Sequence, residues 1–251
     1  MRKLVSPKEV KAWRHSPPSK SLGFVPTMGA LHEGHLSLIR KAKSENDQVM
    51  VSLFVNPTQF NDPKDFENYP KTLNEDLELL ISENVDAVFL PTTEDLYPHG
   101  QGMKVTETEF SKDLCGEFRP GHFDGVLTVV MKLFQIVKPS AAYFGEKDYQ
   151  QLLLIERMVK EFFIDLEIVR VPTLRETNGL AMSSRNRRLS SDEQIKASLL
   201  YKAMKEFEDP KEVQATLEKE GFRVEYVREI KGRRFVAAWL GDVRLIDNVD
   251  L

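Results

Sequence analysis

Between residues 20 and 171, short apolar segments alternate with segments that carry a helical pattern of apolar residues, and this alternation constrains the fold more than any other feature. The segment 49–55, which reads Val-Met-Val-Ser-Leu-Phe-Val, is almost continuously apolar. Such a run is typical of a strand that is buried on both faces of a parallel sheet. Because strand–helix–strand crossovers are right-handed, the alternation predicts an α/β fold with a doubly wound, Rossmann-like parallel sheet.

The pattern also predicts where each element lies. Strands are expected at 22–26, 49–55, 85–90, 141–145 and 166–171, with helices starting near residue 34 and spanning about 72–83, 126–137 and 152–162. Two segments rich in turn-forming residues, 56–70 and 91–121, are expected to form a long loop and a less regular stretch. Ligands bind beyond the carboxyl ends of the strands in such sheets, so the loops that follow the strands are where we expect chemistry.

After Pro172 the pattern changes. Helices are predicted near 192–207 and 210–220, followed by an alternating strand at 222–226 and two short strands near 235–239 and 244–246. This order predicts a smaller α+β domain with an antiparallel sheet. We therefore divide the chain into a first domain of residues 1–171 and a C-terminal domain of residues 172–251.

The composition is that of an ordinary globular protein, with 41% hydrophobic and 29% charged residues. The net charge of −4 argues against a nucleic-acid partner, which usually requires a basic domain. The single cysteine, Cys115, cannot form an intrachain disulfide, and we expect a small buried hydrophobic residue rather than a nucleophile. Since no segment resembles a signal peptide or a membrane helix of about 20 apolar residues, we expect a cytoplasmic protein without a membrane partner.

The turn after the first predicted strand carries two glycines, Gly29 and Gly34, and two histidines, His32 and His35. Glycines allow a close approach of the backbone to a ligand, and a helix N-terminus offers free N–H groups to a phosphate. Two imidazoles at the same place can stabilise the negative charge of a phosphoryl group. The alternatives are that the histidines cap the helix or bind a metal, but a zinc site needs a third protein ligand that the spacing of the other histidines does not supply.

Three further groups follow predicted strands or lie near the domain boundary. Gln59 has both a donor and acceptors and can bind a hydroxyl or a carboxylate, whereas an isolated loop glutamine usually faces water. Lys147 is a compact positive charge suited to phosphates, and Asp148 either accepts from ribose hydroxyls or caps the next helix. The run Met182-Ser183-Ser184-Arg185 suits a pyrophosphate clamp, although a solvated linker has a similar composition.

Four runs in this order resemble the pantothenate synthetase (pantoate–β-alanine ligase) family of the nucleotidyltransferase superfamily. They are Pro26–His35, Phe54–Phe60, Tyr143–Gln151 and Asn178–Asn186. The resemblance covers roughly residues 20–190 and resumes at Arg244–Asn248. The C-terminal part looks short for the family, because a segment that usually separates two strands is missing between Phe222 and Phe235.

The resemblance implies the roles of individual residues. Gln59 and Gln151 would bind pantoate or β-alanine, and His35, together with His32 and Lys147, would be catalytic. The first domain would hold ATP and pantoate, and the C-terminal domain would act as a lid. The residues implied to bind ATP are Met28, Gly29, Ala30, Leu31, His32, Glu33, Gly34, His35, Gly145, Glu146, Lys147, Asp148, Leu174, Met182, Ser183, Ser184 and Arg185.

The implied reaction is the ATP-dependent condensation of pantoate with β-alanine through a pantoyl-adenylate, which releases AMP and pyrophosphate. The resemblance also implies Mg²⁺ as a cofactor and a homodimer, and Glu75 and Asp76 are weighed as Mg²⁺ ligands against the simpler interpretation of a solvated helix start. Two alternatives remain open. One is a different nucleotidyltransferase on the same scaffold, and the other is a protein that binds ATP without turnover.

Overall fold

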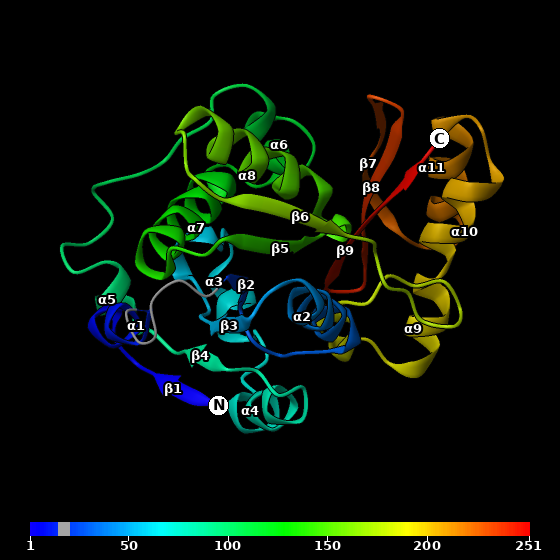
Figure 1. Ribbon diagram of the computed structural model, residues 1–251. Coiled ribbons are helices and arrows are strands. Elements are labelled where there is room, and N and C mark those ends of the chain that lie inside the picture. Colours follow the sequence, from blue (N-terminus) through cyan, green and yellow to red (C-terminus); the bar gives the residue numbers. More distant parts are fainter. Residues whose placement is uncertain (15–20) are drawn as a thin grey trace.

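The computed structural model describes residues 1–14 and 21–251, and it contains two sheets that lie side by side. Figure 1 shows the larger sheet with helices on both of its faces. The smaller sheet lies beside the strand β6 (Glu167–Val171) of the larger sheet, and the C-terminal helices cover the side of the smaller sheet that faces away from the larger one. The larger sheet has six strands, all parallel, and the smaller has three antiparallel strands. The predicted fold class is therefore confirmed.

The strand order of the larger sheet is β1-β4-β3-β2-β5-β6. The chain runs outward from β2 through β3 to β4, and then returns to the other side of β2 for β5 and β6. This reversal places a crevice between the carboxyl ends of β2 and β5, where doubly wound folds bind ligands. The strands are β1 (Arg2–Leu4), β2 (Leu22–Thr27), β3 (Gln48–Leu53), β4 (Ala87–Phe89), β5 (Ala141–Gly145) and β6 (Glu167–Val171).

Alternate residues of the central strands pack into two separate cores. On one face, Val25 and Tyr143 contact a core that includes residues of α2 (Glu33–Glu45) and α4 (Leu73–Ser82). On the other, Phe24 and Phe144 pack with α1 (Pro7–Arg14), α7 (His122–Val137) and α8 (Tyr149–Glu161). The near-continuous apolar runs in the sequence follow from this burial on both faces.

Some elements of this part differ from the predictions. The edge strand β1 was not predicted, because three residues are too few for a periodic signal, and helix α1 was not predicted either. The expected loop 56–70 contains a 3₁₀ helix η1 (Pro57–Gln59) and a short helix α3 (Pro63–Glu67), each capped by the side chain of the preceding Asn or Asp. The stretch 91–121 likewise contains α5 (Thr93–Leu96), η2 (Phe110–Lys112) and α6 (Cys115–Phe118).

The C-terminal sheet has longer strands than predicted. Its strands are β7 (Arg223–Ile230), β8 (Arg233–Leu240) and β9 (Val243–Asp250), each of eight residues, covered by α9 (Ser191–Ala197), α10 (Leu199–Glu206) and α11 (Pro210–Lys219). Arg233 and Arg234 interrupt the apolar pattern but are buried within β8. Arg234 donates to the carbonyls of Met204, Phe207 and Glu208, and this pairing makes its burial possible.

The tight hairpin between β7 and β8 has Lys231 and Gly232 at its tip, both with positive φ (52° and 75°). A two-residue turn of this kind matches the twist of the flanking strands. This tight turn accounts for the missing segment between Phe222 and Phe235 that the sequence indicated. Because β6 ends at Val171, the proposed boundary at residues 171/172 falls directly after the parallel sheet, and the division into two domains stays a prediction.

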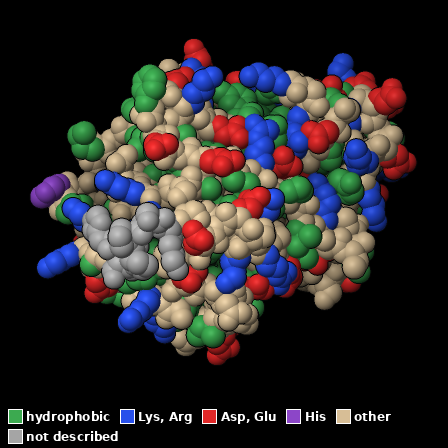
Figure 2. Space-filling model, in the orientation of Figure 1, with side chains coloured by type: hydrophobic (Ala, Val, Ile, Leu, Met, Phe, Trp, Pro, Cys, Tyr) green, Lys and Arg blue, Asp and Glu red, His purple; other side chains and the backbone are tan. Residues whose placement is uncertain are grey.

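Cys115 is buried, as expected, and its Sγ lies 3.1 Å from the hydroxyl of Tyr226. In the visible face of the molecule, Lys and Arg side chains are interspersed with Asp and Glu (Figure 2). No helix within the described ranges is both long enough and apolar enough to cross a membrane.

Candidate active site

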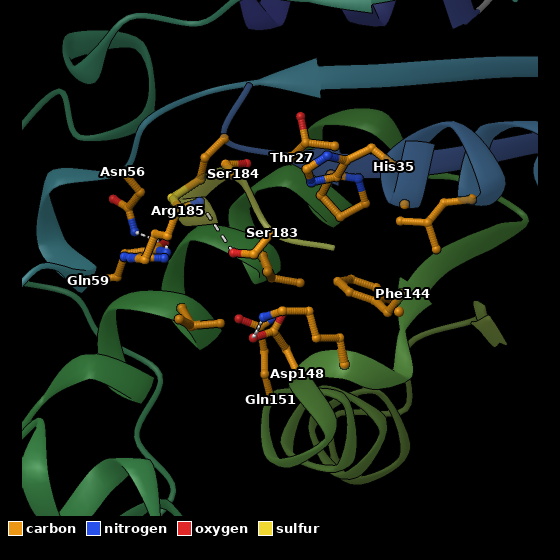
Figure 3. A pocket seen from close by; sticks show the side chains of 18 of the residues that line it. Thr27, His35, Asn56, Gln59, Phe144, Asp148, Gln151, Ser183, Ser184 and Arg185 are labelled. Atoms are coloured by element: carbon orange, nitrogen blue, oxygen red, sulfur yellow. Dashed lines mark hydrogen bonds and ion pairs between the residues drawn. The ribbon is translucent and has the colours of Figure 1, made fainter. Parts of the chain in front are cut away.

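A cavity of about 240 Å³ lies at the switch point, bounded by the loops after β2, β3 and β5 and by the segment 172–185. Figure 3 shows side chains from all of these loops pointing into a common space, with His35 and Gln59 on two sides of it and Asp148 below. The predicted residues that line the cavity are Met28, His32, Gly34, His35, Gln59, Gly145, Lys147, Asp148, Gln151, Leu174, Met182, Ser183, Ser184 and Arg185.

Five residues that were predicted to bind ATP do not line this cavity: Gly29, Ala30, Leu31, Glu33 and Glu146. The side chains of Ala30 and Leu31 are buried, and Glu33 pairs with Arg40 on the surface.

The turn between β2 and α2, residues 27–32, is held by the buried carboxylate of Asp76. Oδ2 accepts from the backbone N–H of Ala30 at 2.9 Å and Oδ1 from that of Leu31 at 2.7 Å. Thr72 donates to the same carboxylate at 3.2 Å. Asp76 is 2% exposed, so the interpretation of a solvated helix start is wrong for this residue. It is correct for Glu75, which is exposed and pairs with Arg187.

The two glycines of the turn make room for protein groups. A Cβ on Gly29 would lie 2.9 Å from Asp76 Oδ2, and the residue has φ of +79°. A Cβ on Gly34 would lie 2.9 Å from the imidazole of His32. Both distances are shorter than van der Waals contact, so a side chain at either position would displace the anchor or the imidazole. Gly34 lines the cavity, and the expectation that the two glycines let a ligand approach the backbone stays a prediction.

The two histidines stack at the start of α2, with ring centroids 4.1 Å apart. His32 is the N-cap, and its Nδ1 accepts from the N–H of Gly34 at 3.1 Å, so the capping alternative is confirmed for this residue. Since Nδ1 is an acceptor, the ring proton is on Nε2 in the neutral form. His35 Nδ1 is buried and has no hydrogen-bond partner among the described residues.

Both imidazoles are neutral near pH 7. Burial, with Lys147 and Arg187 nearby, lowers the pKa of His32 to about 4. Burial lowers the pKa of His35 well below its ordinary value, and His32 and Lys147 add to this effect. The expectation that these rings stabilise a phosphoryl group stays a prediction, and in the neutral form they would do so through hydrogen bonds. They offer N–H donors, and the positive charge comes from lysine and arginine.

Gln59 is fixed by its neighbours at the end of β3. Its Oε1 accepts from Asn56 at 3.1 Å, and its Nε2 lies 3.1 Å from the sulfur of Met28. Its backbone carbonyl lies 2.8 Å from His122 Nδ1 and accepts from Arg119 at 3.1 Å. The sequence did not indicate these neighbours, because His122 and Arg119 are about 60 residues away and belong to no recognisable ligand spacing.

Lys147 and Asp148 lie on the turn after β5. Their charged atoms are 3.7 Å apart. Asp148 makes no side-chain capping bond to α8, so the capping alternative is wrong. The turn is held instead from the other sheet, because the amide of Asn248 in β9 donates to the carbonyls of Glu146 (3.0 Å) and Lys147 (2.9 Å).

The segment 183–188, which closes the cavity from the C-terminal side, is tied to the parallel-sheet part by hydrogen bonds and ion pairs. Ser184 donates to the carbonyl of Ala30 at 3.0 Å. Arg185 and Arg188 share the carboxylate of Asp65 in α3, at 2.8 and 3.0 Å. These contacts place the predicted clamp over the cavity, and the exposed-linker alternative is not what the structure shows.

The described residues do not form a metal site. No group of three or more His, Cys, Asp or Glu side chains in residues 1–14 and 21–251 is arranged to hold a metal ion. Of the two carboxylates that were weighed as Mg²⁺ ligands, Asp76 is occupied by backbone N–H groups and Glu75 faces Arg187. The described residues therefore do not fit a Mg²⁺ site whose ligands come from the protein.

Comparisons with known proteins agree with the geometry. The family model described as pantoate-beta-alanine ligase matches residues 2–250. The chain is 57% identical over 248 residues to the pantothenate synthetase of Bdellovibrio bacteriovorus, covering 99% of this chain and 98% of that protein. It is 51% identical to the pantothenate synthetase of Legionella pneumophila strain Lens, over 92% of each.

Solved structures are also similar. A pantoate-beta-alanine ligase from Francisella tularensis, complexed with beta-gamma ATP and beta-alanine, superposes with a TM-score of 0.96 at 45% identity, covering 100% of this chain and 97% of that one. A pantothenate synthetase from Thermus thermophilus superposes with a TM-score of 0.89 at 40% identity, over 100% and 99%.

Proposed function

The chain belongs to the pantoate-beta-alanine ligase family, and we propose that it condenses pantoate with β-alanine through a pantoyl-adenylate. In the first step a carboxylate oxygen of pantoate attacks the α-phosphorus of ATP, and the bond from that phosphorus to the bridging oxygen breaks to release pyrophosphate. In the second step the amine of β-alanine attacks the acyl carbon, and the bond from that carbon to the phosphate oxygen breaks to release AMP.

One observation carries this proposal: groups that are far apart in the sequence converge on one cavity and suit a triphosphate beside a hydroxy acid. Lys147 and Arg185 supply positive charge, and His32 and His35 supply N–H donors from a helix N-terminus. Stabilising the charge that develops during phosphoryl transfer is the main catalytic task, since the chemistry asks little else of the protein. ATP and β-alanine, which the Francisella relative was crystallised with, are the ligands we propose here.

His35 is the residue we propose as catalytic in the adenylation. A carboxylate nucleophile has no proton to lose, so the first step needs no general base. A neutral His35 donates a hydrogen bond to a phosphate oxygen without the desolvation that a charged ring would require. We propose that His32 and Lys147 act on the same phosphates.

Gln59 and Gln151 are proposed to bind pantoate. In Figure 3, Gln59 lies at the left, after β3, and Gln151 lies at the bottom, on the first turn of α8. Because Gln59 is already oriented by Asn56, binding pantoate costs little side-chain entropy. The C-terminal domain is proposed as a lid that keeps water from the mixed anhydride. A homodimer, Mg²⁺ carried on the nucleotide phosphates and a cytoplasmic location are further proposals that rest on the family alone.

Two other functions were considered. A nucleotidyltransferase for a phosphorylated substrate is disfavoured by Gln59 and Gln151, whose neutral side chains on the cavity suit a hydroxy acid. A protein that only binds ATP would not need His32, His35, Lys147 and Arg185 to line the same cavity.

The test is AMP formation from ATP, pantoate and β-alanine, with each substrate omitted in turn. We expect AMP only with all three, and pyrophosphate exchange into ATP only with pantoate. AMP formation without pantoate, or exchange that follows another acid instead, would contradict the proposal.

A further inference from the structure

Arg119 lies between two cavities. It lines the cavity of the proposed active site and also a larger one of about 590 Å³, which extends from there between α3 and β9. Arg185 is also shared by the two. The two cavities also share Lys147, Asp148 and Ser183, so the larger cavity adjoins the proposed active site where Arg119 and Arg185 lie.

Arg119 makes few hydrogen bonds for a partly buried guanidinium. It donates to the carbonyl of Gln59 at 3.1 Å, and another of its nitrogens lies 3.1 Å from His122 Nε2. A guanidinium has five N–H donors, so donors remain for a ligand. No carboxylate of residues 1–14 or 21–251 lies within ion-pair distance of Arg119.

The neighbouring arginines differ from Arg119 in this respect. Arg185 and Arg188 share Asp65, and Arg244 pairs with Glu225 at 2.7 Å. Burial, and the positive charges of Arg185 and Arg244, lower the pKa of Arg119 to about 10, which leaves it charged at neutral pH. Asp65 lies close enough to favour this charge in part but forms no ion pair with Arg119, so the arrangement suits an additional anionic ligand.

We propose that Arg119 binds the carboxylate of β-alanine, which enters from the larger cavity, and so directs the amine of that substrate at the acyl carbon. This rests on the proposed function. Arg119 donates to the backbone carbonyl of Gln59, the residue proposed to hold pantoate, so a carboxylate bound by Arg119 would lie beside pantoate. Arg119 is thus a specificity-determining residue for the second step.

The step balances without another reactant. The ammonium group of β-alanine loses one proton to water to become a nucleophile. Its nitrogen then forms the C–N bond as the C–O bond to phosphate breaks, AMP leaves with the electron pair, and a second proton passes to water. The carboxylate takes no part in bond making, so an acceptor that lacks it, such as hydroxylamine, should not depend on Arg119.

The experiment compares Arg119→Met with the wild type in three assays: pantoate-dependent pyrophosphate exchange, AMP formation with β-alanine, and capture of the acyl group by hydroxylamine. We expect kcat/KM for β-alanine to fall on the order of 100-fold, since a charge-assisted contact is lost. Exchange and capture by hydroxylamine should fall much less, because β-alanine takes part in neither and only the bond from Arg119 to the Gln59 carbonyl is lost. Arg157→Met is the matched control, because Arg157 pairs with surface glutamates on α8 and beyond, and it should change none of the three.

Two results would overturn the assignment. An unchanged kcat/KM for β-alanine is one, and an equal fall in exchange and in the β-alanine reaction is the other. If Arg119→Met is unstable, Arg119→Lys decides, since it keeps the charge: a selective rise in KM for β-alanine supports the proposal and a loss in exchange contradicts it. Absence of pantoate-dependent exchange in the wild type would instead refute the proposed function.

Discussion

The turn 27–32 and the segment 183–188 both face the cavity, but they are held in different ways. The turn is anchored by one buried carboxylate, Asp76, from a helix on the same sheet. The segment 183–188 is anchored across the molecule, by the ion pairs of Asp65 with Arg185 and Arg188 and by the bond from Ser184 to Ala30.

The difference indicates which part of the site is preformed. Hydrogen bonds to a fully buried carboxylate are costly to break, because the charge cannot find water instead. Ion pairs whose side chains are about a quarter exposed contribute less and are screened by salt. We therefore expect the turn to be rigid before any ligand arrives, and the segment 183–188 to be the part that moves.

The largest effect is expected for Lys147 and His35, which line the cavity that the turn 27–32 and the segment 183–188 both face. Lys147→Ala and His35→Ala should each lower pantoate-dependent pyrophosphate exchange on the order of 100-fold or more, because they remove a charge or an N–H donor aimed at the phosphates. Lys41→Ala, which removes only a surface pair with Glu45, is the control. Near-normal exchange in both site variants would remove them from the mechanism.

Asp76→Asn tests the rigid turn. The amide can accept from only one of the two N–H groups of Ala30 and Leu31, and its own NH₂ group faces the other. We expect exchange to fall about 10-fold through misplacement of the turn, and the free energy of unfolding to fall by about 1–3 kcal/mol, measured by urea titration. Glu75→Gln, the exposed neighbour, should change neither. Equal effects of the two variants would contradict the anchor.

Asp65→Asn tests the segment 183–188. With both ion pairs weakened, amide hydrogen exchange in residues 183–188 should speed up several-fold, which corresponds to about 1 kcal/mol, while the amides of Ala30 and Leu31 keep their protection. Faster exchange in both regions would show that they are one unit and that the comparison is wrong.

A separate effect, on stability rather than on activity, concerns pH. The pKa of His32 is about 4 in the folded protein and near its ordinary value when unfolded, so the unfolded chain binds more protons between about pH 4 and 6.5. Stability therefore rises with pH through this window and is lost as pH falls toward 4. His32→Asn, which keeps a good N-cap, should flatten part of the slope in urea titrations at successive pH values. An unchanged slope would mean that His32 is not held neutral by the fold.

The sequence was sufficient for the parallel sheet and for the loops that carry the site. Alternating strand and helix patterns have few compatible topologies, and the residues singled out at strand ends, such as Gln59 and Lys147, do line one cavity. What the sequence lacked was long-range partners. Asp76 has the local pattern of a solvated helix start, and only the fold reveals that two backbone N–H groups 45 and 46 residues away point at it.

The C-terminal sheet shows a related limit. Arg233 and Arg234 shortened the predicted strand, because charged residues are seldom buried unless they are paired. Their partners come from other elements, so burial was not predictable from the local pattern. Asn248 likewise holds the Lys147 turn across about 100 residues, a contact that no spacing rule would find.

The most direct test is a crystal structure of this protein with a non-hydrolysable ATP analogue. The account predicts that the triphosphate lies between Lys147, Arg185 and the two imidazoles, with the turn 27–32 unmoved and the segment 183–188 shifted toward the nucleotide. A nucleotide bound elsewhere, or at this cavity with those side chains turned away from its phosphates, would contradict it.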